Sequence, residues 1–274
     1  MARLRKQKIA DQADRHHLYQ ESVQDTEAEI NFVEETWQEL RDRPAELLRE
    51  DFCGTVNTAC EWVRRDPQHY AIAIDWDPEV LEWGRLNNLE QLDDDQFRRI
   101  TLLQENVLEA QTEPADIVLA MNFSYFLFLE RADLLDYFCA VYDSLAGDGI
   151  FFLDAYGGYD APKEIEEERE CEGFTYIWDQ ASFNPIDSRM TCHIHFEFPD
   201  KSRLDKAFSY DWRLWTLPEI RELLEIAGFS EVTVYWEGTD EESGEGDGVY
   251  QPSEVGDADP GWVCYIVAAS YNTT

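Results

Sequence analysis

Two acidic residues follow two apolar segments at a spacing that suits nucleoside binding. Residues 45–48 lead into the turn Asp51-Phe52-Cys53-Gly54-Thr55, and residues 70–74 end in Asp75. An acid about 20 residues beyond a glycine turn, at the end of the following strand, can accept hydrogen bonds from both hydroxyls of a ribose. We therefore predict that Asp75 binds a ribose. Trp76 would pack on the attached base, with core packing as its alternative role.

Two further polar segments complete the candidate site. Gln104-Glu105-Asn106-Val107 and Ala120-Met121-Asn122-Phe123-Ser124-Tyr125 each follow an apolar run. Ligands of open α/β sheets bind outside the carboxyl ends of the strands, so the second segment should face the reacting group. Asn122 could hold a second substrate there, beside a wall formed by Phe123 and Tyr125. The alternative is a packed loop in which Asn122 is a capping residue.

The residues between these segments have helical periodicity, which predicts how the segments are positioned. Strands are expected at 45–48, 70–74, 100–103, 115–120 and 150–153, separated by helices at 58–65, 79–88 and 133–145. Such alternation is typical of βαβ units, and the runs at 232–236 and 263–268 extend the same sheet. We predict an α/β fold with a Rossmann-like, mostly parallel seven-stranded sheet and helices on both faces.

The pattern divides the chain into four parts. Residues 1–44 are expected to form a helical lid, 45–158 the Rossmann-like core, 159–212 an antiparallel insertion, and 213–274 the end of the core sheet. Within the insertion, 174–178 and 190–198 alternate as strands, whereas 160–172 is expected to be a charged helix or loop. The acidic segment 239–261 is expected to be a long surface loop.

In order and spacing, these segments resemble the class I S-adenosylmethionine (SAM)-dependent methyltransferase family, across residues 45–155 and more weakly to 268. Cys53-Gly54-Thr55 matches the family's GxGxG loop, which often ends Cys-Gly-Thr-Gly, and Glu50 stands where the family has an acid. Phe52 and Val56 replace the first and third glycines, which would permit positive φ and close approach to the ligand. The chain is similar to the family's Glu-Asp-Phe-Cys-Gly-Thr variety.

The resemblance implies SAM as the cofactor and S-adenosylhomocysteine (SAH) as the product. Asn106 stands where the family has an acid that accepts from the adenine amino group, with Glu105 as the alternative acceptor. Asp77 competes with Asp75 for the ribose but is better suited to cap the next helix. Residues 17–24 resemble a lid helix, with Gln24 as a further contact. The implied cofactor contacts are Tyr19, Glu50, Phe52, Cys53, Gly54, Thr55, Asp75, Trp76, Asn106, Val107, Asn122 and Phe123.

The methyl acceptor is less well specified. The candidate catalytic residues are Asn122, Tyr125 and Tyr156, and the candidate acceptor contacts are Tyr125 and Arg213, whose guanidinium could bind a carboxylate. An acceptor that carries a proton needs a base, for which Asp154, Tyr156, His193 and His195 are candidates. The two histidines share one strand face, where hydrogen-bonded side chains are a better interpretation than a metal site, so we predict no metal. Aromatic residues of the insertion are expected either to cover the mouth of the site or to form the core of the insertion itself.

The composition limits the partners. The 274 residues carry a formal net charge of −37, which disfavours nucleic acid and anionic membranes and is typical of proteins adapted to concentrated salt; an acidic surface for a basic partner is the alternative. No apolar run is long enough to span a bilayer, and no secretory signal follows the basic start, so we expect a cytoplasmic protein. The six cysteines form no CxxC pair and are expected to be free thiols.

The residues fit four functions to different degrees. A methyltransferase acting on a small-molecule acceptor is favoured, because the aromatic insertion could close over a compact ligand. A protein methyltransferase and a SAM-binding module without turnover are the alternatives, the latter because two loop glycines are replaced. An NAD-dependent dehydrogenase is disfavoured, because Phe52 and Val56 would obstruct a pyrophosphate. A homodimer is compatible with the sequence.

Overall fold

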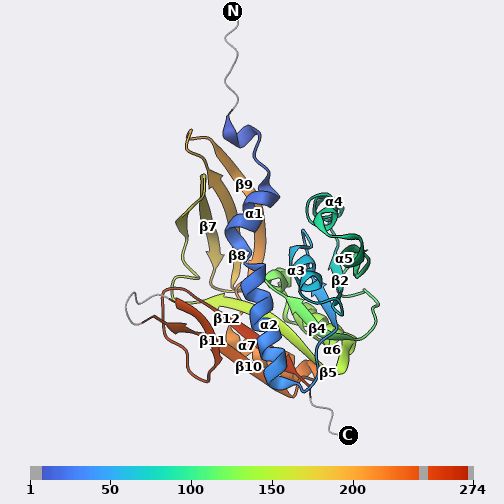
Figure 1. Cartoon of the computed structure of the whole chain (residues 1–274). Helices are drawn as coiled ribbons and strands as arrows, with labels where there is room; N and C mark the ends of the chain where they lie inside the picture. Colours follow the sequence, from blue (N-terminus) through green and yellow to red (C-terminus); the bar gives the residue numbers. More distant parts are fainter. Residues whose placement is uncertain (1–7, 241–245, 271–274) are drawn as a thin grey trace, which may run out of the picture.

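The computed structural model describes residues 8–240 and 246–270 (Figure 1). Residues 1–7, 241–245 and 271–274 lie outside the described residues, and with them the corresponding parts of the expected lid, acidic loop and C-terminal segment. Short apolar runs form the centre of the main sheet, where strand β4 (Ala115–Ala120) is buried along its whole length between β1 (Leu47–Asp51) and β5 (Leu145–Gly157). Burial on both faces explains why these runs do not alternate.

Within the described residues, the main sheet has eight strands in the order β11-β10-β12-β5-β4-β1-β2-β3. The strands β1 to β5 are parallel, and β12, β10 and β11 follow as antiparallel neighbours. The expected α/β fold with a mostly parallel sheet is confirmed. The additional strand is β11, which lies in the segment expected to be a loop. The other bounds are β2 Tyr70–Asp75, β3 Ile100–Gln104, β10 Glu231–Thr239, β11 Gly246–Pro252 and β12 Trp262–Ala269.

Helices cover both faces of this sheet, as expected. Helices α6 and α7 bury residues such as Tyr137 and Leu223 against one face, and α2 and α3 bury Val33, Trp37 and Trp62 against the other. The capping box of Thr216 and Glu219 begins α7. The bounds are α2 Thr26–Leu40, α3 Asn57–Arg65, α4 Pro78–Asn87, α5 Asp94–Arg98, α6 Arg131–Ser144 and α7 Leu217–Ala227, with short 3-10 turns η1 Ile9–Asp11, η2 Leu89–Gln91 and η3 Ser124–Leu127.

The insertion is a separate antiparallel sheet in the order β6-β7-β8-β9. Its middle strands β7 (Phe174–Asn184) and β8 (Arg189–Glu197) match the expected pair. The expectation for 160–172 was wrong in part, because β6 (Ile165–Cys171) is a strand. Its acidic run lies on an exposed edge, where the alternation that identifies strands is absent. The pattern also did not reveal the other edge strand, β9 (Arg203–Arg213).

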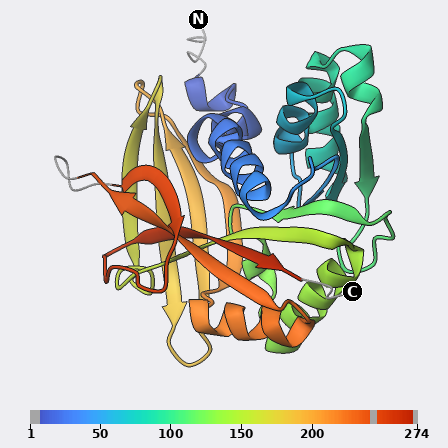
Figure 2. The same cartoon turned by 60° about the horizontal axis from the view of Figure 1, so that its bottom comes forward.

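The predicted N-terminal lid consists of two helices with different contacts. Helix α1 (Arg15–Val23) packs through Leu18 onto the insertion sheet, whereas α2 belongs to the core of the main sheet. Figure 2 shows these helices, in blue, between the insertion strands and the helices that follow β1 and β2. Among the described residues, no helix is both long and apolar enough to cross a membrane.

Candidate active site

The turn after β1 keeps the backbone of a glycine-rich loop although two of its glycines are replaced. Phe52, Gly54 and Val56 have φ values of 57°, 49° and 64°. These are the positions at which the GxGxG pattern has glycine, whereas a residue with a side chain pays about 1–2 kcal/mol for this conformation. The sequence therefore departs from the pattern while the backbone follows it.

Neighbouring elements hold this strained turn in place. The Gly54 N–H donates to Asp75 Oδ2 (2.9 Å), and the side chain of Val56 is completely buried. The ring of Phe52 packs against Tyr137, with their centroids 5.4 Å apart. Helix α4 approaches so closely at Gly84 that a Cβ there would lie 2.5 Å from the Thr55 carbonyl oxygen. Strain of this kind persists where the surroundings over-determine the backbone, which is typical of ligand sites.

Two carboxyl groups at the strand ends lie beside the turn, with Glu50 buried and Asp75 partly buried. Asp75 accepts from the backbone N–H groups of Gly54 and Asp77, and burial raises its pKa. Glu50 accepts from Ala59 N–H (2.9 Å) in the first turn of α3, and burial raises the pKa of its carboxyl to about 8. Asp77 caps α4 through Glu79 N–H, as expected. The expected acid pair Glu50 and Asp75 thus lies at one edge of the sheet.

A cavity of about 570 Å³, here called the strand-end cavity, opens at this edge. Trp76 is 79% exposed on its wall, so its alternative role in core packing is wrong. The basic residues Arg15, His16 and Lys206, which the sequence did not suggest, also line it, and burial lowers the pKa of His16. The sequence-predicted residues in its lining are Tyr19, Gln24, Glu50, Phe52, Cys53, Gly54, Thr55, Asp75, Trp76 and Asn122.

The loop after β4 is fixed by one buried carboxylate. Asn122 and Phe123 both have positive φ (57° and 55°), and their N–H groups donate to the two oxygens of Asp154, each at 2.8 Å. Burial raises the pKa of Asp154 to about 7. Because Asp154 is buried, lines neither cavity and accepts a backbone N–H at each oxygen, it positions the loop and does not reach an acceptor as a base.

A second cavity of about 620 Å³, here called the aromatic cavity, adjoins the first. Tyr19, Asn122 and Tyr210 line both cavities and form their shared wall. The candidate Tyr156 lines the aromatic cavity, and its hydroxyl donates to Met190 Sδ (3.0 Å). The other aromatic rings in its lining are Phe123, Tyr176, Trp178, Trp212, Tyr250 and Trp262.

Four predicted site residues lie outside the linings of both cavities. Tyr125 is completely buried, and its hydroxyl donates to the Asp154 carbonyl (2.7 Å), so it does not reach an acceptor. Arg213 stacks on Trp215 and pairs with Glu219 (2.8 Å), which supports the start of α7 in place of the expected carboxylate binding. These two expectations were wrong because nearby partners use both side chains.

The expected adenine contacts are also placed elsewhere. The side chain of Asn106 accepts from Leu108 N–H (3.1 Å) in a local turn, and Val107 is buried with its carbonyl accepting from Arg49 (3.1 Å). Glu105 donates its N–H to the Asp75 carbonyl. This segment therefore continues the pairing of β3 with β2 through the bond from Glu105 to Asp75. Neither Asn106 nor Val107 belongs to the lining of the strand-end cavity.

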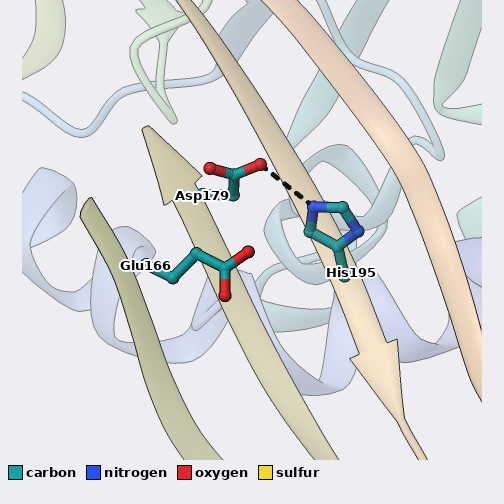
Figure 3. Close-up of side chains that lie close together, drawn as sticks. All are labelled: Glu166, Asp179 and His195. Carbon is teal, nitrogen blue, oxygen red and sulfur yellow. Dashed lines mark hydrogen bonds and ion pairs between the residues drawn. The ribbon is translucent and has the colours of Figure 1, made fainter. Parts of the chain in front are cut away.

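The histidines of β8 are hydrogen-bonded side chains on the sheet face opposite to the aromatic cavity. Ile194, between them, lines that cavity, and side chains alternate along a strand. His193 bonds to Ser209 Oγ (2.8 Å). Figure 3 shows His195 with Asp179 and Glu166, whose ligand atoms lie within 4.8 Å of one another.

The protonation of His195 argues against metal binding by this cluster. The Lys206 N–H donates to His195 Nδ1 (3.0 Å), so the ring proton is on Nε2, which faces Asp179 Oδ2 at 3.3 Å. A ring in that state offers a donor to Asp179 and no free lone pair to a cation. The histidines are therefore placed as structural donors and acceptors, and not as bases for the acceptor.

Sequence reasoning missed several lining residues. Tyr250 comes from the acidic segment 239–261 that was expected to be a loop, Trp262 follows that segment directly, and Lys206 comes from the unrecognised strand β9. The aromatic Tyr250 within a strongly acidic segment was the available signal, because such residues rarely serve a solvated loop.

Comparison with known proteins identifies the architecture. No protein-family model and no curated protein sequence matches the chain. A SAM-dependent methyltransferase from Clostridium acetobutylicum superposes with a TM-score of 0.69 at 16% identity, covering 93% of this chain and 96% of that chain. The fold is that of a class I SAM-dependent methyltransferase.

Two further solved structures have the same fold. A SAM-bound amino pentose methyltransferase from Micromonospora echinaspora, involved in calicheamicin biosynthesis, gives a TM-score of 0.64 at 14% identity, covering 93% of this chain and 95% of that one. A sugar N-methyltransferase from Streptoalloteichus gives 0.61 at 17% identity, covering 94% and 92%. The likeness includes the insertion, since it extends over nearly the full length of each chain.

Proposed function

We propose that the chain is a SAM-dependent methyltransferase with a small-molecule acceptor. SAM would bind in the strand-end cavity and the acceptor in the aromatic cavity. The observation that carries this proposal is that Tyr19, Asn122 and Tyr210 line both cavities. A ligand in each cavity would therefore contact the same three residues. The structural neighbours that act on amino pentoses and sugars support an acceptor of small size.

The chemistry of the strand-end cavity fits an adenosyl sulfonium. Asp75 stands at the end of β2 as a ribose acceptor, and the exposed ring of Trp76 beside it can stack on adenine. Among the acids in this lining, Asp75 and Asp77 favour a cationic ligand and would repel the pyrophosphate of a dinucleotide, whereas Glu50 is protonated at neutral pH and Asp51 is paired with Arg49. Arg15 and Lys206 are available for the cofactor's carboxylate.

In this proposal the protein acts mainly by positioning. SAM supplies a methyl group on a good leaving group, so alignment of the acceptor with that methyl can contribute several kcal/mol. Asp154 fixes the backbone of Asn122 and Phe123 at the shared wall. Within residues 8–240 and 246–270 no hydrogen bond engages the Asn122 carboxamide, which leaves it available to orient an acceptor. Tyr156 would form a wall of the acceptor site.

The existence of the second cavity favours turnover over a binding module without activity. A module that only senses SAM needs one cavity, whereas here the loop that borders the cofactor site also borders the aromatic cavity. The aromatic cavity also draws on both sheets and α1, which suits a compact ligand better than an extended protein segment.

Thermal unfolding with SAM, SAH and NAD in concentrated salt tests the cofactor assignment. A ligand at 100 times its Kd adds about 2.7 kcal/mol of stability, so SAM and SAH are expected to raise Tm and NAD is not. Asp75→Ala should abolish the shift, and Asp75→Asn, which preserves the side-chain volume, should reduce it. Asp136→Ala, an exposed position on α6, is the matched control. Stabilisation by NAD alone would refute the proposal.

A further inference from the structure

The aromatic cavity has the composition of a site for a cationic group. Trp178, Tyr210 and Trp212 line one side as a ring cluster, with Tyr210 and Trp212 stacked at 4.5 Å between centroids. The indole N–H of Trp178 donates to Gln180 Oε1 (3.3 Å), and the amide of Gln180 donates to the carbonyls of Asp160 and Lys163. The wall is therefore held in one orientation before any ligand binds.

One cation of the protein already lies against an aromatic ring of this cavity. The guanidinium of Arg169 lies 5.2 Å from the centroid of the Tyr176 ring and donates to the Ser22 carbonyl of α1. The same cavity is lined by the carboxyl groups of Glu167 and Glu237, so its charged side chains include more acids than bases. Aromatic faces together with negative charge favour a cation over an anion.

As far as the described residues extend, the shared wall itself offers no base to an acceptor; the carboxyl groups of Glu167 and Glu237 stand elsewhere in the lining of the aromatic cavity. Burial raises the pKa values of the Tyr19 and Tyr210 hydroxyls, which are hydrogen-bonded to each other, and Asn122 does not titrate. Both oxygens of Asp154 are taken by backbone donors, and the histidines of β8 lie on the other sheet face. A hydroxyl acceptor must lose its proton to a base, whereas a neutral amine attacks with its own lone pair.

We propose that the acceptor is an amine, held in the aromatic cavity by ring faces, and that methyl transfer occurs to nitrogen. This inference rests on the proposed function. The amine enters as an ammonium ion and gives a proton to water. Its lone pair then forms the N–C bond with the methyl of SAM, while the C–S bond breaks and its electron pair goes to sulfur. Sulfur thereby becomes neutral, and the nitrogen carries the positive charge.

The transferred charge explains the contrast between the two sites. During the reaction one positive charge moves from the strand-end cavity, whose wall is rich in acids, to the aromatic cavity. Groups aimed at the position where charge develops stabilise the transition state. The ring faces of Trp178, Tyr210 and Trp212 would stabilise the positive charge that develops on the methylated nitrogen without accepting a proton from it. A product that still has an N–H then loses that proton to water.

A matched pair of probes tests the amine assignment. Choline and 3,3-dimethylbutan-1-ol have the same shape, but choline has a quaternary nitrogen where the alcohol has a quaternary carbon. Binding of each to the full chain saturated with SAH is measured by calorimetry at one KCl concentration. Choline is expected to bind about tenfold more tightly, because several ring faces contact its cation.

Three variants locate the effect. Trp178→Leu should reduce the preference for choline to near unity, and Trp178→Phe should restore part of it, since a ring face returns. Tyr70→Leu is the control, because Tyr70 is a half-exposed aromatic residue at the start of β2, outside both cavities. The retained Tm shift with SAH shows in each case that the variant is folded.

The outcomes separate the two proposals. SAH binding together with a choline preference that depends on Trp178 supports the amine acceptor. Equal affinities, tighter binding of the alcohol, or no binding of either probe while SAH binds would overturn the amine assignment and leave the cofactor assignment intact. Absence of SAH binding counts instead against the proposed function.

Discussion

The strand-end cavity and the aromatic cavity are built from different parts of the sequence. The first is centred on the ends of β1, β2 and β4 and the loops that follow them, where its key contacts use backbone N–H groups and carboxylates, and α1 and β9 complete its wall. The second takes single side chains from α1, both sheets and the segment before β12. The centre of the first site is thus encoded in short contiguous runs, whereas the second site is encoded only in the folded arrangement.

This difference implies different responses to mutation. If the two cavities hold the cofactor and the acceptor as proposed, a change in a strand-end loop should alter one backbone geometry and affect mainly cofactor binding, whereas a change of one ring should affect mainly acceptor binding. The loop of Asn122 and Phe123 is the exception, since it borders both cavities. Substitutions at and around that loop therefore show whether the two sites are separable.

The largest effect is expected from Asp154→Ala. It leaves the N–H groups of Asn122 and Phe123 without an acceptor, at about 1–3 kcal/mol for each buried donor, and frees the loop. Denaturant unfolding should show the loss of stability, and calorimetry should show weaker binding of both SAH and choline.

Asp116→Ala is the matched control for that variant. Asp116 also accepts two backbone N–H groups, from Glu46 and Leu47, but at the opposite end of the sheet. It should lower stability and leave both affinities unchanged. Equal losses of ligand binding in the two variants would show that Asp154 acts only through global stability.

The pH dependence of folding stability should come largely from two buried carboxyl groups at strand ends, those of Glu50 and Asp154. Burial raises the pKa of Glu50 to about 8 and that of Asp154 to about 7, so the folded state binds protons more tightly than the unfolded chain. Their contribution is present at low pH and is lost as pH rises, by up to about 1.4 kcal/mol per pH unit per proton. Tm without ligand should fall from about pH 5 to about pH 8.

Glu50→Gln isolates that dependence, because glutamine keeps the acceptor for Ala59 N–H and removes the proton equilibrium. The fall in Tm with pH should become shallower in this variant. An unchanged slope would assign the titration to other groups, such as the buried Glu29 on α2, whose pKa burial and the nearby Asp154 also raise.

A more moderate effect is expected from Trp76→Ala. Stacking of a base on an aromatic side chain contributes about 1–3 kcal/mol, and Trp76 is exposed in the strand-end cavity. SAH affinity should fall by that amount with little change in stability, since the ring packs on little else. Choline binding should be unaffected; a parallel loss would mean that the cavities are not independent.

The smallest effect compares Val56→Gly with Val56→Ala. Both remove the two buried γ-methyl groups, and glycine also removes the β-carbon, but only glycine relieves the positive φ of 64°. Glycine should therefore be the more stable variant by about 1 kcal/mol, the reverse of the usual order inside a helix. Denaturant midpoints measure the difference, and a more stable alanine variant would contradict the strain assigned to this turn.

The sequence predicted the core of the fold and one of the two cavities. Buried parallel strands such as β4 appear as short apolar runs, and the acids Glu50 and Asp75 mark the strand ends. It did not predict β6 and β11, because edge strands with polar side chains lack an alternating pattern.

Other residues were misassigned because sequence order does not give side-chain direction. Tyr125 and Arg213 have suitable side chains, but in the fold Tyr125 donates a hydrogen bond to the Asp154 carbonyl and Arg213 forms an ion pair with Glu219. Conversely, Asp154 was considered for its acidity, and only the structure reveals that two backbone donors occupy it. Which of several polar groups meets which is decided by tertiary packing.

Helix α1 has a consequence for how acceptor preference could diverge among relatives. Tyr19 borders both cavities, and the neighbouring Gln20 donates to Thr55 Oγ1 (2.9 Å) in the turn after β1. Substitutions on this helix that enlarge the acceptor site should also disturb cofactor affinity, so their effects should be strongly non-additive. Trp262 and Tyr250 lie away from that junction, and new specificities should accumulate there first.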